Sequence, residues 1–115
     1  MAEVSLGEPA FLILTALTGE PRHGYAVIED VHEISGGQVR LYAGTLYSVL
    51  DRLREGGLIE VDREEVVRSR LRRYYRITGA GRERLAAETA RLRRHADAAS
   101  ARLADFGPRP QVGPA

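Results

Sequence analysis

The stretch from residue 41 to residue 59 places the strongest constraint on the fold. Four apolar residues within it fall at positions i, i+3, i+4 and i+7, which make one stripe on an α-helix: Leu46, Val49, Leu50 and Leu53. Gly56 and Gly57 predict the end of this helix, because glycine adopts the left-handed C-terminal conformation without steric cost. The following segments alternate as strands do. A short helix is therefore expected to lead directly into a β-hairpin.

The other face of this helix is polar, and its hydroxyl groups lie near the N-terminus. That face carries Thr45, Tyr47, Ser48, Asp51, Arg52 and Glu55. Such a helix end suits insertion into the major groove of DNA, where N-terminal residues contact base edges. An ordinary amphipathic helix with a solvated face fits this stretch equally well, so the stretch alone leaves both interpretations open.

Two further helices are expected upstream. Residues 5–18 form the first, with Pro9 in its first turn, where a missing N–H group has no consequence. Residues 24–34 form the second, with an apolar residue at every third position. The buried stripe predicted for it consists of Tyr25, Ile28, Val31 and Ile34.

The second and third predicted helices make a helix–turn–helix candidate. The loop between them, residues 35–42, is longer than the usual turn of about 3–4 residues. Loops of this length are common in winged variants of the motif, so the candidate stands. Val39 and Leu41 are expected to form a very short strand before the third helix.

Residues 58–65 and 70–77 read as two antiparallel strands of a hairpin. The connecting segment contains no Gly, Asn or Pro, so an irregular or mobile tip is expected. Residues 66–84 carry seven arginines against one glutamate, a net charge of +6, although the whole chain has a net charge of only +1. Arginines on a two-stranded ribbon can straddle a phosphate backbone or enter a minor groove. A solubilising edge strand is the alternative, and the position after a helix–turn–helix candidate favours DNA.

The last helix is expected over residues 79–106, with Thr78 as its N-cap. Its side chains at heptad spacing, called the seam below, are Leu85, Thr89, Leu92, Ala96, Ala99, Leu103 and Phe106. Three helices and a hairpin already fill the core of a small domain, so a second copy of the seam is the expected partner. Packing on the first helix of the same chain is the alternative. Prolines and glycines predict a disordered tail over residues 107–115.

Several classes of protein are excluded by what the sequence lacks. A chain of 115 residues implies one domain with an appended helix. The absence of cysteine excludes disulfides and thiolate metal sites, and no apolar run of about 18 residues could cross a membrane. The N-terminus lacks the basic residues of a signal peptide, so a cytoplasmic location is expected. His23, His32 and His95 show no metal-ligand spacing, and no phosphate-binding loop occurs, so we predict no enzyme, metal or cofactor.

Several short motifs, in this order and spacing, resemble the PadR family of winged helix–turn–helix transcriptional regulators. They are His23-Gly24-Tyr25, Gly44-Thr45-Leu46-Tyr47, Leu50-Asp51-Arg52-Leu53, Gly56-Gly57-Leu58-Ile59 and Arg73-Tyr74-Tyr75-Arg76-Ile77-Thr78, followed by Gly81. The resemblance covers residues 8–105, and the length is similar to that of the short subfamily. It implies a mainly α fold with a small β-hairpin (α+β). A winged helix–turn–helix DNA-binding domain is then expected at residues 5–78 and a C-terminal dimerisation helix at residues 79–106.

The same resemblance implies a homodimer on an inverted-repeat operator of double-stranded DNA. The function implied is sequence-specific repression, relieved by a small aromatic effector. The DNA-binding residues expected are Gly44, Thr45, Tyr47, Ser48 and Arg52 on the recognition helix, and Arg68, Arg70, Arg72 and Arg73 on the wing. The dimerisation residues expected are those of the seam. A winged-helix protein-interaction module without DNA binding is the alternative, and the basic wing argues against it.

The chain departs from the family pattern at three points. Tyr42-Ala43 stands where the family often has Ser-Pro, which removes a helix cap, and Gly79 stands where proline is usual. No tryptophan is present, so drug binding between two tryptophans, as in some members, cannot operate here. Phe11 and Phe106 are candidate linings of an effector cavity, with core packing as the favoured role for both.

Overall fold

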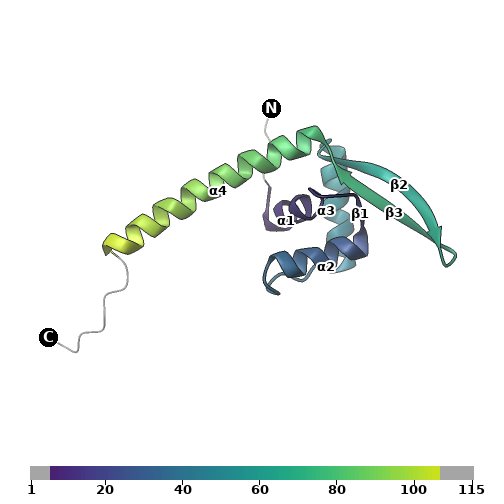
Figure 1. The fold of residues 1–115 in the computed structure, drawn as a ribbon, viewed down its shortest axis with the longest axis horizontal. Helices are drawn as coiled ribbons and strands as arrows, with labels where there is room; N and C mark the ends of the chain where they lie inside the picture. Colours follow the sequence, from purple (N-terminus) through teal and green to yellow (C-terminus); the bar gives the residue numbers. More distant parts are fainter. Residues whose placement is uncertain (1–5, 107–115) are drawn as a thin grey trace.

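The computed structural model describes residues 6–106, so the tail predicted at residues 107–115 lies outside the described residues. The elements in order are α1 (Glu8–Ala16), β1 (Arg22–His23), α2 (Gly24–Ile34), α3 (Ala43–Glu55), β2 (Ile59–Val67), β3 (Arg70–Ile77) and α4 (Gly79–Phe106) (Figure 1). The predicted α+β class is confirmed. The hairpin of β2 and β3, called the wing below, projects on one side of the helices, and α4 projects on the other (Figure 1).

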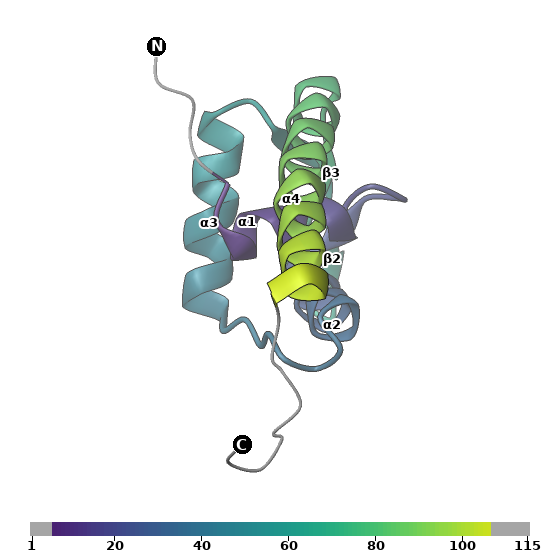
Figure 2. The ribbon, with the colours of Figure 1, turned by 90° about the vertical axis from the view of Figure 1, so that its left-hand side faces the viewer.

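Helix α1 lies at the centre of the helical layer. It contacts α2, α3 and α4, and the second view shows it passing between α3 and α4 (Figure 2). Pro9 lies in its first turn as predicted, and the helix ends at Ala16, earlier than expected. The largest fully buried side chains come from α1, α2, α3 and β2, with Leu17 just after α1: Ile13, Leu14, Leu17, Val27, Val31, Leu46, Leu50 and Ile59.

The buried face of α2 matches the predicted stripe only in part: Val31 is buried and Ile28 packs against the core. Tyr25 is 67% exposed and Ile34 is also exposed, whereas Gly24, Val27 and Val31 are buried. A repeat of three residues cannot stay on one face of a helix with 3.6 residues per turn. Over the three repeats from Tyr25 to Ile34 it drifts by about 180°. The stripe at spacings of three and four is the one that packs.

The wing belongs to a three-stranded antiparallel sheet in the order β1-β3-β2. Strand β1 pairs Arg22 with Tyr75 and His23 with Tyr74, and the Arg22 side chain donates a 3.0 Å hydrogen bond to the Ala16 carbonyl at the end of α1. The strand expected at Val39 and Leu41 is wrong, because that segment is irregular in the described chain. The short strand therefore precedes α2 instead of following it.

The wing tip is a regular turn, so the expectation of an irregular tip is wrong. Arg68 and Ser69 have φ angles of +52° and +65°. Positive φ at both central residues is the condition of a type I′ turn, which matches the twist of the flanking strands. The irregularity lies instead inside the wing, where a register shift between Val61 and Arg63 marks a bulge.

The junction between α3 and α4 is closely packed. Gly57, at φ +76°, ends α3, and the Leu58 N–H donates to the Leu53 carbonyl at 2.9 Å, as in a Schellman motif. The Thr78 hydroxyl accepts the Gly81 N–H at 3.0 Å, which confirms the predicted cap, and it donates to the Gly57 carbonyl at 2.7 Å. A Cβ atom on Gly81 would lie 2.1 Å from the Leu58 carbonyl oxygen. Gly81 is therefore required by this close approach.

Helix α4 packs on the domain only through its first turns. The Arg82 guanidinium donates to the Thr18 carbonyl at 2.8 Å, and Leu85 is partly buried against the core. Every residue from 90 to 106 is exposed. Packing on the first helix thus involves only the start of α4, and most of the seam faces solvent.

Candidate nucleic-acid interface

The N-terminal half of α3 presents its polar face to solvent. Gly44, Thr45 and Ser48 are exposed, while Leu46 on the same turns is buried. Among the described residues no side chain caps this helix at Tyr42, as the missing Ser-Pro predicted, yet the helix begins at Ala43. Its first backbone N–H groups and the positive end of its dipole therefore lie beside the exposed hydroxyls, an arrangement that favours a phosphate.

Tyr47 lies over the first residue of α2. A Cβ atom at Gly24 would come within 2.6 Å of the Tyr47 hydroxyl oxygen, so a larger residue there would displace the Tyr47 side chain. The two motifs that contain Gly24 and Tyr47 therefore contact each other, which the sequence alone did not indicate. The side chain of Tyr47 is still 48% exposed. It positions α3 against α2 and keeps one edge available to a ligand.

His23 links the start of α2 to the wing. Its Nδ1 atom accepts the Ala26 N–H at 3.4 Å and so caps α2. Its ring lies edge-to-face on Tyr74, with centroids 5.4 Å apart. Burial, and then the neighbouring Arg72 cation, lower the pKa of His23 below its ordinary value of 6.5. At neutral pH His23 is therefore uncharged and retains its acceptor nitrogen.

A groove of about 330 Å³ separates the start of α2 and Tyr47 from the end of the wing. It brings together all four wing residues predicted to bind DNA: Arg68, Arg70, Arg72 and Arg73. The exposed ring of Tyr25 also lines it. Cations and aromatic rings are thus placed beside the recognition face of α3, although they come from separate parts of the sequence.

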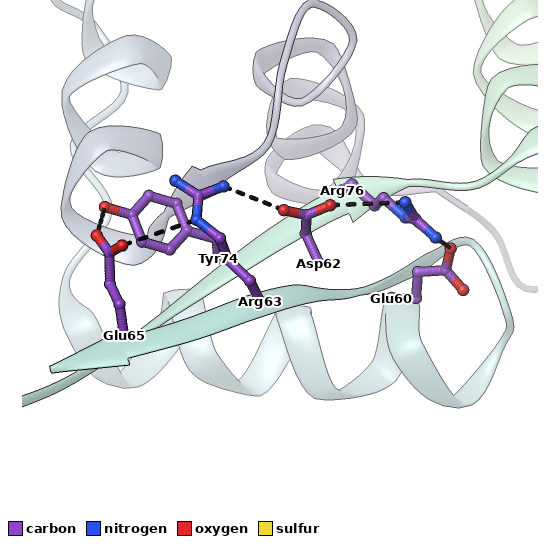
Figure 3. Close-up of polar contacts among 6 residues, drawn as sticks. All are labelled: Glu60, Asp62, Arg63, Glu65, Tyr74 and Arg76. Carbon is purple, nitrogen blue, oxygen red and sulfur yellow. Dashed lines mark hydrogen bonds and ion pairs between the residues drawn. The ribbon is translucent and has the colours of Figure 1, made fainter.

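A ladder of ion pairs runs from the base of the wing along β2 (Figure 3). Arg76 lies 2.7 Å from Glu60 and 3.5 Å from Asp62, and Asp62 in turn lies 3.1 Å from Arg63. The Arg63 guanidinium also lies 3.8 Å from Glu65 and stacks 3.9 Å above the ring of Tyr74 (Figure 3). The basic stretch on β3 is therefore matched by an acidic strand, β2, which the charge count over residues 66–84 did not include.

The wing arginines divide into two groups. Arg73, predicted as a DNA contact, lies 2.8 Å from Glu64, which raises its pKa. Arg68, Arg70 and Arg72, called the tip arginines below, form no ion pair with any residue between 6 and 106. The cationic part of the wing is consequently its end, beside the groove.

The family model for the transcriptional regulator PadR-like family matches residues 13–87. The match spans more than half of the chain, from α1 to the first turns of α4. This chain belongs to the PadR-like family of transcriptional regulators. The family is one of regulators and not of enzymes.

Solved structures of PadR proteins share this fold. A PadR family transcription regulator from hypervirulent Clostridium difficile superposes with a TM-score of 0.73 at 24% identity, covering 84% of this chain and 99% of that one. A PadR family transcriptional regulator from Eggerthella lenta gives 0.68 at 28% identity, with 82% and 80% covered. Bacillus subtilis PadR in complex with operator DNA gives 0.62 at 21% identity, with 70% of this chain and 46% of that chain covered.

Arg52 lies apart from the groove of this PadR-like chain. It lines a mainly apolar pocket of about 440 Å³ between α1, the C-terminal half of α3 and the start of α4, together with Leu6, Pro9, Leu53 and Leu58. Neither candidate aromatic lines this pocket: Phe11 packs against the core, as favoured, whereas Phe106 is 76% exposed at the end of α4.

Two features of other protein classes are absent from residues 6–106. No group of three or more His, Asp or Glu side chains there could hold a metal ion. None of the helices in the same range is long and apolar enough to cross a membrane.

Proposed function

We propose that this PadR-like regulator binds double-stranded DNA sequence-specifically, with the N-terminal half of α3 in a major groove and the tip arginines on the flanking backbone. The single observation that carries the proposal is the groove in which these arginines meet Tyr47 of the recognition helix. Bacillus subtilis PadR, which has the same fold, is solved in complex with operator DNA, and this supports DNA binding by the present chain. Base contacts are assigned to Gly44, Thr45, Tyr47 and Ser48, and phosphate or minor-groove contacts to the tip arginines. Arg52, one turn beyond Ser48, is assigned a contact with the DNA phosphate backbone.

The experiment compares operator and random duplexes, with the operator selected from a random pool. Fluorescence anisotropy across a salt series should show that Arg72→Ala weakens both duplexes and reduces the salt slope by about one unit per contact. Ser48→Ala should instead lower the preference for operator, since a good base contact is worth about 1–3 kcal/mol. Arg102→Ala, the same charge change near the far end of α4, is the control. Unchanged binding by Arg72→Ala would contradict the proposal.

We propose that two copies associate through the seam of α4. The exposure of Leu92, Leu103 and Phe106, in a helix that is otherwise well formed, supports this assignment. A two-fold axis between the copies would place the recognition helices on successive major grooves, about 34–36 Å apart, on an inverted repeat. Leu92→Asp with Leu103→Asp should give a folded monomer by light scattering. Ala101→Asp, on the opposite side of α4, should remain dimeric.

We further propose that the regulator represses transcription and that a small aromatic effector releases it. The apolar pocket walled by α1, α3 and α4 supports the effector, because a ligand there would touch both the recognition helix and the dimerisation helix. A promoter–reporter fusion should show lower expression with the protein present. A hydroxycinnamic acid should raise the melting temperature and lower operator affinity. A rise in melting temperature without loss of operator binding would contradict the effector role.

A further inference from the structure

The outer strand of the wing is acidic. β2 is an edge strand of the sheet, and it carries Glu60, Asp62, Glu64 and Glu65 opposite the arginines of β3. The ladder register places Glu64 against Arg73 and Glu65 against Arg72. The wing therefore carries negative charge beside the arginines that are expected to contact DNA phosphates.

These carboxylates hold specific partners. Glu64 binds Arg73 at 2.8 Å, and Glu65 lies 3.8 Å from Arg63. The Tyr74 hydroxyl donates to Glu65 at 2.7 Å, which keeps this carboxylate at the surface of the wing (Figure 3). The side chains in the two ion pairs are about half exposed, between 41% and 50%. Such exposed pairs add little to stability, so folding alone is a weak reason for them.

We propose that Glu64 and Glu65 are specificity determinants that lower affinity for non-operator DNA. Glu64 occupies Arg73, which would otherwise bind phosphate, and Glu65 places a negative charge opposite Arg72. This inference rests on the proposed DNA-binding function. Binding to random DNA comes almost entirely from phosphate contacts and counterion release. An arginine that must first leave a carboxylate contributes less to that binding, and the carboxylate itself repels phosphate. Operator binding gains base contacts in addition, so it depends less on these arginines.

The other explanation is that an acidic edge strand prevents pairing between sheets of different molecules. In that case the carboxylates would protect solubility and have no effect on the choice between duplexes. Glutamine has nearly the same shape as glutamate and keeps a polar edge. Replacement by glutamine therefore changes the charge, which DNA senses, and largely preserves the polarity that protects the edge.

The test uses the full chain with Glu64→Gln and Glu65→Gln combined, and circular dichroism to verify folding. Fluorescence anisotropy should show affinity for a random duplex rising by roughly three- to tenfold, with a salt slope steeper by about one unit for the released Arg73. Affinity for the selected operator should rise less, so that the ratio of operator to random binding falls. Glu83→Gln with Asp97→Asn, the same charge change on α4, should leave that ratio unchanged.

A double-mutant cycle assigns the effect to the ion pair itself. Arg73→Ala should change random-duplex binding little in the wild-type background and several-fold more in the Glu64→Gln background, because only there is the arginine available to phosphate. An unchanged or higher operator-to-random ratio in the double glutamine variant would overturn the inference, as would an equal effect of the α4 control. If the wild-type chain itself shows no operator preference, the proposed function fails together with the inference. A wild-type preference that the glutamine variant keeps in full overturns the inference alone.

Discussion

Helix α3 buries its apolar stripe inside the domain, whereas helix α4 exposes most of its own. In α3 the four stripe residues are buried, and Leu50 is fully inaccessible. In α4, Leu92 is 39% and Leu103 is 61% exposed. Both helices show regular apolar spacing, so periodicity identifies an apolar face in each case. The difference is that α1 and the sheet cover the stripe of α3, while nothing within residues 6–106 covers the stripe of α4 beyond its first turns.

The largest effect is expected from paired truncations on the two stripes. Leu50→Ala should lower the free energy of unfolding by about 2–5 kcal/mol at any protein concentration, because it leaves a cavity in the core. Leu103→Ala should cost under about 0.5 kcal/mol in dilute, dissociated protein, as for a surface site, and more as concentration rises. Urea denaturation over a concentration series measures both. An equal loss at high dilution would show that α4 packs within its own chain.

A somewhat smaller effect is expected where the two helices meet. Gly81→Ala should destabilise the fold by about 1–3 kcal/mol, because the added methyl group overlaps the Leu58 carbonyl. Gly79→Ala is the matched control, since a Cβ atom there would meet no described atom within 4 Å beyond its chain neighbours and its own helix backbone. That control should leave stability unchanged or raise it by up to about 1 kcal/mol. Thermal unfolding followed by circular dichroism distinguishes the two variants. Equal melting temperatures would mean that the backbone at the junction shifts to accommodate the methyl group at little cost.

The hydroxyl at the same junction should contribute less. Thr78→Ala removes both the cap of α4 and the bond to the Gly57 carbonyl. We expect a loss of about 0.5–2 kcal/mol in the free energy of unfolding, the usual range for an N-cap. Thr78→Ser keeps the hydroxyl and should retain most of the stability. Chemical denaturation of the three proteins tests this, and an equal loss in the serine variant would assign the effect to the methyl group instead.

The smallest effect is expected from His23, the residue that caps α2 beside α3. The pKa of His23 is lowered in the folded protein, so the unfolded chain takes up more protons as pH falls through 6.5. The free energy of unfolding should therefore decrease between about pH 7.5 and about pH 5.5. His23→Asn keeps a capping acceptor and should flatten this part of the pH dependence. A variant with the wild-type slope would assign the proton uptake to another group.

The elements that the sequence predicted well are those governed by local rules. The stripe of α3, its glycine end and the Thr78 cap depend on residues within a few positions of each other. The stripe of α2 was predicted only in part: Val31 and Ile28 pack in or against the core. Tyr25 and Ile34 are exposed because a repeat of three drifts around the helix. Strand β1 was missed because two residues become a strand only through pairing with Tyr74 and Tyr75, far along the chain.

The candidate site shows the same division. The polar face of α3 and the wing arginines follow from composition and order. The contact of Tyr47 with Gly24 and the pairing of Arg73 with Glu64 depend on register and packing between distant segments, which no single window of sequence contains. The individual DNA and dimer contacts remain predictions.

The turn at the end of the wing carries a further consequence, for protein engineering. Arg68 and Ser69 both hold a left-handed backbone that glycine or asparagine would adopt more easily. Ser69→Gly is therefore the conservative route to a more thermostable regulator, because it relieves the backbone strain of the positive φ angle and leaves every charge in place. The same change at Arg68 would relieve the backbone and remove a cation. Selection for heat resistance would thus accept glycine at both positions, whereas selection for operator affinity would keep arginine at position 68.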